Sequence, residues 1–362
     1  FDGTLDGKGF GFTNLKIKNA DADFSIFYGF GESAVVKNIK INGKINTTSG
    51  KIYPLVQRVK GRIENCTTTA TLQSETGKIT GLLENIEIGG VVDNCHFDGN
   101  ISTGTDEEIG GEVAGIASET SGVLKNCTAK GTFDGAFRAA GIVLGQMSFN
   151  KANDDYSDED FLIENCTNYV NITRICERLV SNRLYDTISG IGAGICAQQY
   201  GGIIRNCVNY GDITLPESTF IASGESSKGS WDAATILGGI VAEENGSIQY
   251  HRLGQIENCV NYGTISGYAA KMSGILASSV QMGCDYAISD CTNYGKVDSQ
   301  FVYGKNISGG SNYAAGIMAY CASTRTGVIE NVKNYGEINT VDNASIAGGV
   351  VGRYFGEGSS AN

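Results

Sequence analysis

The stretch IENCVNYGTI at residues 256–265 decides how this chain folds, because close variants of it return along the sequence. The phrase reads IENCTNYVNI at 163–172, IRNCVNYGDI at 204–213, ISDCTNYGKV at 288–297 and IENVKNYGEI at 329–338. Positions equivalent to Cys259 follow one another at intervals that vary along the chain, from 27 residues (Ile39 to Cys66) to 52 residues (Cys207 to Cys259). A short minimum interval with variable additions predicts a solenoid whose rungs carry inserted loops.

A second phrase accompanies the first in most rungs, for example VAGIAS at 113–118 and GAGICA at 192–197. Alternating Ile or Val with small residues predicts a short buried strand. Three short strands in a rung of about 27 residues match one coil of a parallel β-helix, in which stacked coils share one core. We therefore expect an all-β fold, a right-handed parallel β-helix of about nine coils, forming a single domain over residues 1–362.

Each position of the repeated phrase has an expected structural role. The Ile and Cys side chains should point into the core, and Cys66, Cys95, Cys127, Cys166, Cys207, Cys259 and Cys291 should form a stack of unlinked thiols. The Asn before each Cys should occupy a bend, where stacked amides can bond from rung to rung. Gly211, Gly263, Gly295 and Gly336 should adopt positive φ. The Tyr residues of successive rungs should stack as a ladder, either as plain packing or as a sugar-binding surface.

Composition and charge exclude several classes of partner. The net charge is −12 and the sequence pI is about 4.7, which repels nucleic acid and anionic lipid surfaces. No apolar run approaches the roughly 20 residues of a membrane-spanning helix. Two histidines and no CxxC pair argue against a zinc site. We expect no nucleic-acid binding and no membrane insertion.

A resemblance to a known group rests on FDGTLDGKGFGFTNLKI at 1–17, the NC…NYG phrases and AGGVVG at 347–352. Together they resemble the β-helical repeat regions of bacterial cell-surface proteins, including those with the GLUG motif. The resemblance implies secretion or surface display within adhesin-like or protease-associated chains. It carries no agreed catalytic residues, so none is transferred to this sequence.

The C-terminal segment RYFGEGSSAN at 353–362 contains no amphipathic helix that could cover the last rung. An uncovered strand edge invites pairing with another chain. We therefore expect the chain to be a fragment of a longer protein, or to meet another subunit at this edge.

Function in a solenoid concentrates on insertions that leave one side of the rungs. The insertion at 215–236 holds Trp231 and Asp232, and the insertion at 243–255 holds Tyr250, His251 and Arg252. A Trp on a loop is a good sugar-stacking or protein-contact residue. We expect these residues to form a loop-built face that binds a glycan or a host or surface protein without catalysis.

Two alternatives stay open because fold alone does not fix function. One is a carbohydrate-active enzyme, either a glycoside hydrolase with two facing carboxylates or a polysaccharide lyase using Lys228, His251 or Arg252. The other is a structural spacer or assembly subunit. A deep cleft with paired carboxylates would favour the enzyme, and a face packed on another rod would favour assembly.

A calcium ion is the one cofactor that the sequence suggests. The insertion SFNKANDDYSDEDF at 148–161 contains Asp154, Asp155, Asp158 and Asp160. Calcium takes six to eight oxygen ligands, but the spacing is not that of an EF-hand. The alternative is a solvated acidic loop.

Overall fold

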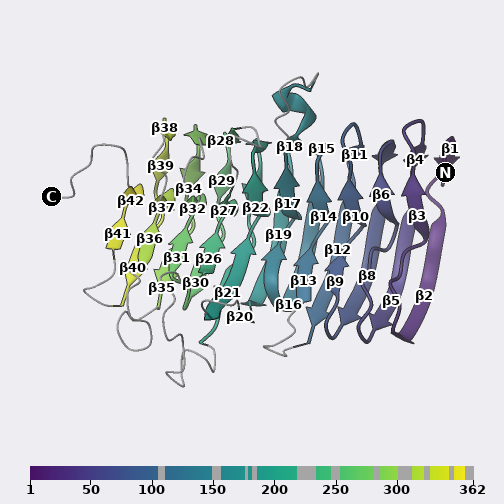
Figure 1. Cartoon of the computed structure of the whole chain (residues 1–362), viewed down its shortest axis with the longest axis horizontal. Helices are drawn as coiled ribbons and strands as arrows, with labels where there is room; N and C mark the ends of the chain where they lie inside the picture. The colour runs from purple at the N-terminus through teal and green to yellow at the C-terminus, as the bar shows by residue number, and fades with distance from the viewer. Residues whose placement is uncertain are drawn as a thin grey trace.

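The structure is a computed structural model. It describes residues 1–104, 111–148, 156–175, 178–181, 186–217, 234–245, 253–279, 286–300, 312–321, 327–341 and 346–354. Within these ranges the chain is all-β, and the one helix is the short 3₁₀ helix η1 (Asp158–Asp160). Long stacks of parallel strands run along the molecule, with the first strands of the chain at one end and the last strands at the other (Figure 1). This arrangement is compatible with a β-helix.

The strands form three sheets. Sheet A contains β1 (Thr4–Asp6), β4 (Val35–Lys37), β7 (Arg62–Glu64), β11 (Val91–Asp93), β15 (Val123–Lys125), β18 (Leu162–Glu164), β23 (Gly202–Arg205), β28 (Gly254–Glu257), β33 (Tyr286–Ser289) and β38 (Val328–Glu330). Sheet C contains β3 (Phe27–Phe30), β6 (Val56–Val59), β10 (Leu83–Ile86), β14 (Ala117–Thr120), β17 (Val143–Met147), β22 (Cys196–Tyr200), β27 (Val241–Glu244), β32 (Leu276–Ser279), β37 (Met318–Cys321) and β42 (Val351–Tyr354).

Sheet B lies between them along the chain. Its N-terminal strands are β2 (Gly11–Ala20), β5 (Lys40–Thr47), β8 (Thr67–Ser74), β9 (Lys78–Thr80), β12 (His96–Thr103), β13 (Gly111–Ala114), β16 (Thr128–Ala140), β19 (Thr167–Ile175), β20 (Arg178–Ser181) and β21 (Asp186–Ala193). Its C-terminal strands are β24 (Val208–Asn209), β25 (Ile213–Leu215), β26 (Ala234–Gly238), β29 (Val260–Asn261), β30 (Ile265–Gly267), β31 (Lys271–Ser273), β34 (Thr292–Asn293), β35 (Val297–Ser299), β36 (Tyr313–Ala315), β39 (Lys333–Asn334), β40 (Ile338–Thr340) and β41 (Ile346–Gly348).

The chain visits the sheets in a repeating order, as the sequence repeat predicts. The rung around Cys95 runs through β11 in sheet A, β12 and β13 in sheet B, and β14 in sheet C, before β15 returns to sheet A. Equivalent residues of neighbouring rungs pair in register, such as Val92 with Leu124 and Phe97 with Ala129. The antiparallel pair β20–β21 is an exception, and it belongs to an inserted segment.

The core lies between the sheets and contains the predicted cysteine column. All seven column cysteines are buried and unlinked, as are Cys196 and Cys321. Burial raises the pKa of the Cys127 and Cys207 thiols, which favours the neutral form. All seven column cysteines belong to the main hydrophobic core, as expected. Cys176 and Cys284 lie outside the described residues.

The bend before each cysteine is confirmed. Asn65, Asn94, Asn126, Asn165, Asn206, Asn258, Asp290 and Asn331 all have φ between 49° and 56°. Asn and Asp tolerate this left-handed region better than other L-residues. Their amides also bond between rungs: Asn258 Nδ2 donates to Asn206 Oδ1 at 2.8 Å. Each bend joins a sheet A strand to a sheet B strand.

The prediction of positive φ for Gly211, Gly263, Gly295 and Gly336 is wrong, since none of them has a left-handed backbone. Glycine is needed there for close approach instead. A Cβ on Gly263 would lie 2.0 Å from the carbonyl oxygen of Gly211 in the preceding rung. At Val170 the β19 strand continues unbroken, whereas the glycine rungs split into two short strands.

The interpretation of VAGIAS and its equivalents as one strand is also wrong. The phrase is a corner: β13 ends at Ala114, and β14 begins at Ala117 in a different sheet. A Cβ on Gly115 would lie 2.1 Å from the carbonyl oxygen of Gly141, so the rungs stack closely at this corner. Ile116 is buried in the core. Small residues are thus required by the bend between sheets B and C.

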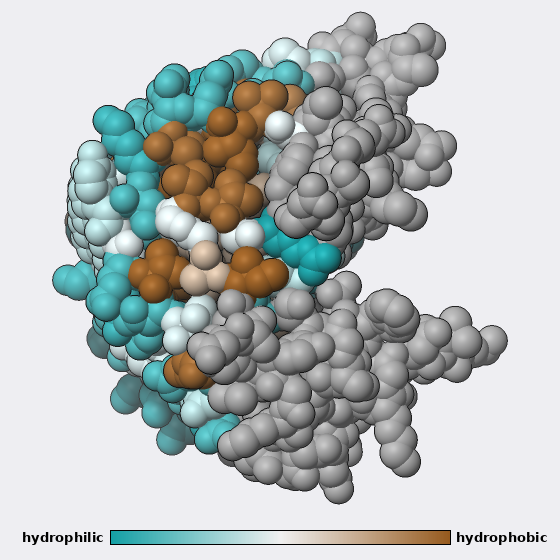
Figure 2. Space-filling model, turned by 90° about the vertical axis from the view of Figure 1, so that its left-hand side faces the viewer, coloured by the Kyte–Doolittle hydropathy of each residue, from teal (hydrophilic) through white to brown (hydrophobic). Residues whose placement is uncertain are grey.

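The C-terminal end of the stack presents apolar side chains to the viewer in Figure 2. Val328 and Val341, in the last rung, are 50% and 55% exposed. The expectation that this edge is covered by a further domain or subunit depends partly on residues 355–362, which lie outside the described residues.

Candidate functional site

The outward side of the corner between sheets B and C forms a second cluster of buried residues. Val113, Ala139 and Leu237 belong to the main core. Their strand neighbours point the other way, because successive side chains alternate between the faces of a strand. These neighbours form a separate buried cluster, whose members are Ala114, Ala140, Leu144, Ile191, Ala193, Ala197, Ile236, Ala242 and Ala277. We call this outward surface, from β13 and β14 to β36 and β37, the corner floor.

A file of charged and polar side chains runs along the corner floor. Lys78 Nζ lies 3.0 Å from Glu112 Oε2, and Arg138 Nη2 lies 2.9 Å from Glu112 Oε1. Arg138 also donates to Gln198 Oε1, and Gln198 Nε2 donates to Glu243 Oε2 at 2.7 Å. Each of these side chains lies on a different strand, so the pairing of the strands fixes the distances between successive members of the file.

The file continues toward the C-terminal rungs with lysine and tyrosine. Lys271 Nζ lies 4.5 Å from the centroid of the Tyr320 ring, a cation–π distance. The Tyr320 and Tyr313 rings lie 4.9 Å apart and are tilted by 40°. Arg353 donates to the Tyr313 hydroxyl. Lys271 is only 3% exposed and Glu243 is 9% exposed, so this part of the floor is buried.

Two glutamates of the floor differ in acidity. Burial raises the pKa of Glu243 and outweighs the opposing effects of the Gln198 hydrogen bond and the charges of Lys271 and Arg138. Burial also acts on Glu112, but the nearby Arg138 and Lys78 hold its pKa below the ordinary value. The same surface therefore carries one carboxyl that resists ionisation and one that favours it.

The buried polar atoms of the floor that have no hydrogen-bond partner include Ser273 Oγ, Ser278 Oγ and Arg138 Nε. Ser278 pairs in register with Glu243 on one side and Tyr320 on the other. Ser273 lies two residues after Lys271 on β31. A buried polar group without a partner is costly and calls for an explanation, such as a bound molecule.

The fold does not need these charges. Along one column of sheet B the residues in register are Glu112, Arg138, Ile191, Ile236 and Lys271. Isoleucine fills two of these positions and is buried there. Burying charge costs free energy that apolar packing would avoid. Charged residues at an otherwise apolar corner therefore indicate a functional role.

The five residues predicted to bind a ligand, Trp231, Asp232, Tyr250, His251 and Arg252, lie outside the described residues. The segments from which they extend are described. Ala234 opens β26 after the first insertion, and the second insertion follows Glu244, the last residue of β27. Strands β26 and β27 are consecutive strands of the corner floor. Both insertions thus join the floor in the same rung.

The sequence analysis missed Arg138, Gln198, Lys271 and Tyr320, although Glu243 is the first residue of its second insertion, 243–255. A signal was present, because each of these residues lies within or beside an Ala/Gly-rich corner phrase, as in FRAAG and GIMAY. A charged or aromatic residue there is unusual for a tightly packed bend.

The predicted calcium ligands are only partly described. Asp154 and Asp155 lie outside the described residues, and Asp158 and Asp160 lie in η1. Asp160 Oδ2 accepts hydrogen bonds from the Ser157 backbone N–H at 2.7 Å and from the Ser157 hydroxyl. The neighbouring Glu159 pairs with Arg205 at 2.7 Å. In the part of the chain that the structure covers, no three potential ligands gather around a point.

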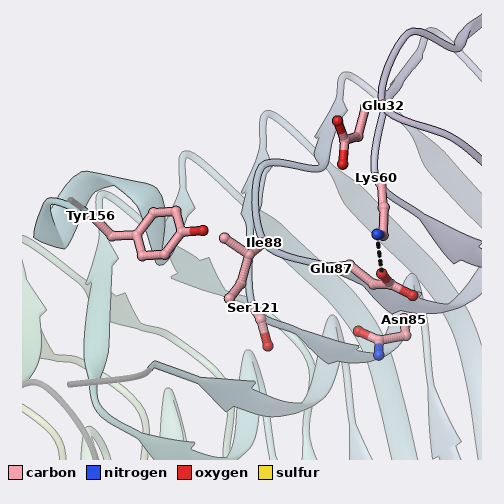
Figure 3. A pocket seen from close by; sticks show the side chains of 7 residues that line it. All are labelled: Glu32, Lys60, Asn85, Glu87, Ile88, Ser121 and Tyr156. Carbon is pink, nitrogen blue, oxygen red and sulfur yellow. Dashed lines mark ion pairs between the residues drawn. The ribbon is translucent and has the colours of Figure 1, made fainter. Parts of the chain in front are cut away.

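A shallow hollow of about 390 Å³ lies on another side of the molecule (Figure 3). Glu32, Lys60, Asn85, Glu87, Ile88, Ser121 and Tyr156 line it. Lys60 Nζ faces Glu87 Oε2 at 3.8 Å, and the lysine side chain is 49% exposed. This solvated ion pair at the strand ends offers a ligand less fixed geometry than the corner floor.

No helix in the described ranges is long and apolar enough to span a membrane. Comparisons of the chain with protein-family models, with curated proteins and with solved structures gave no significant match.

Proposed function

We propose that this chain is a right-handed parallel β-helix of about nine coils that is secreted or displayed on a cell surface and binds a glycan at its corner floor. The repeated path through three parallel sheets supports the β-helix. The resemblance of the repeat phrases to bacterial surface proteins supports the location. No catalytic step is required for this role.

The observation that carries the proposal is the set of buried, strand-mounted polar groups around Lys271. The Lys271 ammonium, the Glu243 carboxyl and the partnerless hydroxyls of Ser273 and Ser278 lie on β27, β31 and β32 of the floor. They combine hydrogen-bond donors and acceptors on rigid elements, as a specific polar ligand requires.

A glycan fits this combination better than a wholly apolar or highly charged ligand. Sugar hydroxyls can donate to Glu243 and accept from Lys271, while Tyr313 and Tyr320 supply aromatic surface beside them. The file extends over several rungs, so an oligosaccharide lying along the stack would meet polar groups at repeated intervals.

Access to the floor has a kinetic consequence. Lys271 and Tyr313 are 3% and 4% exposed, so a glycan reaches them only if the site opens. Association that requires a conformational change is slower than ordinary protein–ligand encounter. We expect slow association for any glycan that binds here.

The alternative function is glycan cleavage on the same floor. It is favoured by one observation: burial raises the pKa of Glu243, as a general acid requires, while Arg138 and Lys271 supply nearby positive charge. Hydrolysis would need a second carboxylate at a suitable distance. Elimination would instead need one of Lys271 and Arg138 to act as the base that removes a proton from a uronate sugar. The other would neutralise the uronate carboxylate.

A glycan array combined with reducing-end assays on the glycans that bind separates the candidates. Binding without new reducing ends supports the binding protein. New reducing ends that Glu243→Gln abolishes support the enzyme. If no glycan binds and nothing is cleaved, while the protein captures a protein ligand or none, the proposal is wrong.

A further inference from the structure

A second surface on sheet B has no role in the proposed function. Five tyrosines of successive rungs, Tyr169, Tyr210, Tyr262, Tyr294 and Tyr335, stack in a row. Their ring centroids are 5.0 to 5.1 Å apart, and neighbouring planes differ by 3° to 13°. Each side chain is nevertheless 46% to 64% exposed. We call this row with its flanking columns the tyrosine face.

The stacking decides what the tyrosine face can bind. Because each ring covers the flat side of the next, a sugar cannot stack on the inner rings. What remains exposed is a line of ring edges and hydroxyl groups. A contiguous exposed aromatic row is unusual on a monomeric protein and marks an interaction surface. Tyr is also enriched in protein–protein interfaces.

The column two residues after each tyrosine carries charges of both signs. Its members are Asn171, Asp212, Thr264, Lys296 and Glu337, in rung order. Hydrogen bonds hold the first part of the column together. The Asp212 N–H donates to Asn171 Oδ1 at 3.0 Å, and the Thr264 N–H donates to Asp212 Oδ1 at 2.7 Å. Asp212 lies one rung before Thr264, and Lys296 lies one rung after it.

We propose that the tyrosine face is a homodimer interface, in which a second copy packs on it in the reverse direction. A two-fold axis parallel to the strands and through the Tyr262 rung reverses the order of the rungs. It places Tyr262 opposite itself, and Tyr210 opposite Tyr294 of the second copy. The same operation brings Asp212 opposite Lys296 of the second copy, and this pair occurs twice.

Two features favour a second copy over another partner. An identical stack has the same rung spacing, so the two tyrosine rows stay in register along their whole length. The charges of Asp212 and Lys296 also complement each other under this two-fold axis, as an interface between identical copies requires. Lys296 already lies 3.2 Å from Asp298 of its own chain, which holds the ammonium near the face.

The size of the face sets the expected affinity. Five rungs about 4.8 Å apart span roughly 20 Å, and seven residues at about 3.3 Å each span a similar width. Two such patches bury roughly 900 Å² in total, which is the size of a weak, transient interface. We therefore expect a weak dimer, with a dissociation constant on the order of micromolar to tens of micromolar.

Sedimentation velocity over a wide range of concentration tests the proposal. Wild type should shift from monomer to dimer. Lys296→Glu places a carboxylate opposite Asp212 and should raise the dissociation constant at least tenfold. The matched control is Lys44→Glu, since Lys44 is an exposed lysine of the same column outside the five tyrosine rungs. This control should dimerise like wild type.

A rescue variant separates charge from damage to the fold. Adding Asp212→Asn to Lys296→Glu keeps an oxygen acceptor for the Thr264 N–H and removes the repulsion, so dimerisation should partly return. The proposal is wrong if wild type stays monomeric at about 100 µM. It is also wrong if Lys296→Glu and Lys44→Glu change the dissociation constant equally. Unchanged melting temperatures would show that every variant folds.

Discussion

Asparagine occupies two positions in the NCxNYG phrase, and the two residues have different structural roles. Asn258 bends the chain with φ of 49° and is exposed. Asn261, three residues later, is fully buried, and its Nδ2 donates to Asn293 Oδ1 at 2.8 Å and to the Gly263 carbonyl at 3.0 Å. The first role could be predicted, because Asn favours bends. The second could not, because its neighbours are 32 and 52 residues away.

Asn261→Ala should therefore cost more stability than Asn258→Ala. The first change leaves the amides of Asn209 and Asn293 short of a partner in the core, and we expect a loss of about 3 kcal/mol or more. The second change places Ala in the left-handed region at the surface, which costs roughly 1–2 kcal/mol. Denaturant unfolding of both variants measures the difference. Equal losses would mean that the buried ladder adds little.

The raised pKa of Glu243 should make the stability of the folded protein decrease as the pH rises. Its pKa in the folded protein is raised above the ordinary value of 4.5, so its contribution to stability is present below that value and is lost as pH rises through the raised pKa. Glu243→Gln cannot ionise and keeps the acceptor for Gln198. The melting temperature of Glu243→Gln should therefore rise relative to that of wild type as the pH increases above 4.5.

Glu112→Gln provides a control of opposite sign. The pKa of Glu112 is lowered, so its stabilising effect is present at neutral pH and disappears as pH falls through the folded value. This variant should melt below wild type at neutral pH, with the gap closing in acid. If both variants respond to pH in the same direction, the charges of the floor are not arranged as described.

At the scale of the element, glycine sets how closely the rungs approach. The repeated NYG phrase identifies the glycines that matter for stacking, and positive φ was the expected reason for them. The structure gives a different reason, since Gly211, Gly263 and Gly295 form a column in which a Cβ on one would meet the carbonyl of the previous one. A contact between rungs cannot be read from the local sequence of one rung.

Gly263→Ala should thus be strongly destabilising even though the φ of Gly263 is not positive. Its Cβ would lie 2.0 Å from a backbone oxygen, and overpacking of this kind costs about 1–3 kcal/mol or more. Gly349→Ala is the matched control, because a Cβ there meets nothing within 4 Å. Calorimetric melting of the two variants checks this. A tolerated Gly263→Ala would refute the close-approach explanation.

At the scale of the whole molecule, the sequence predicted the stacking of rungs but not the site. Cys, Tyr and Asn columns follow from the repeat, because equal slots of successive rungs must lie above one another. The corner floor joins residues of two sheets, since its buried cluster contains both Ile236 of β26 and Ala242 of β27. The sequence contained Lys271 and Arg138 but gave no reason to place them on one surface.

The most direct test of the glycan-binding proposal is calorimetric titration of the best array glycan into Lys271→Met and Lys296→Met. Met at position 271 suits a column that elsewhere holds Ile, so the fold should persist. We predict that Lys271→Met lowers affinity at least tenfold, whereas Lys296→Met, on the tyrosine face, binds like wild type. Unchanged affinity in a folded Lys271→Met protein would contradict the placement of the glycan on the corner floor.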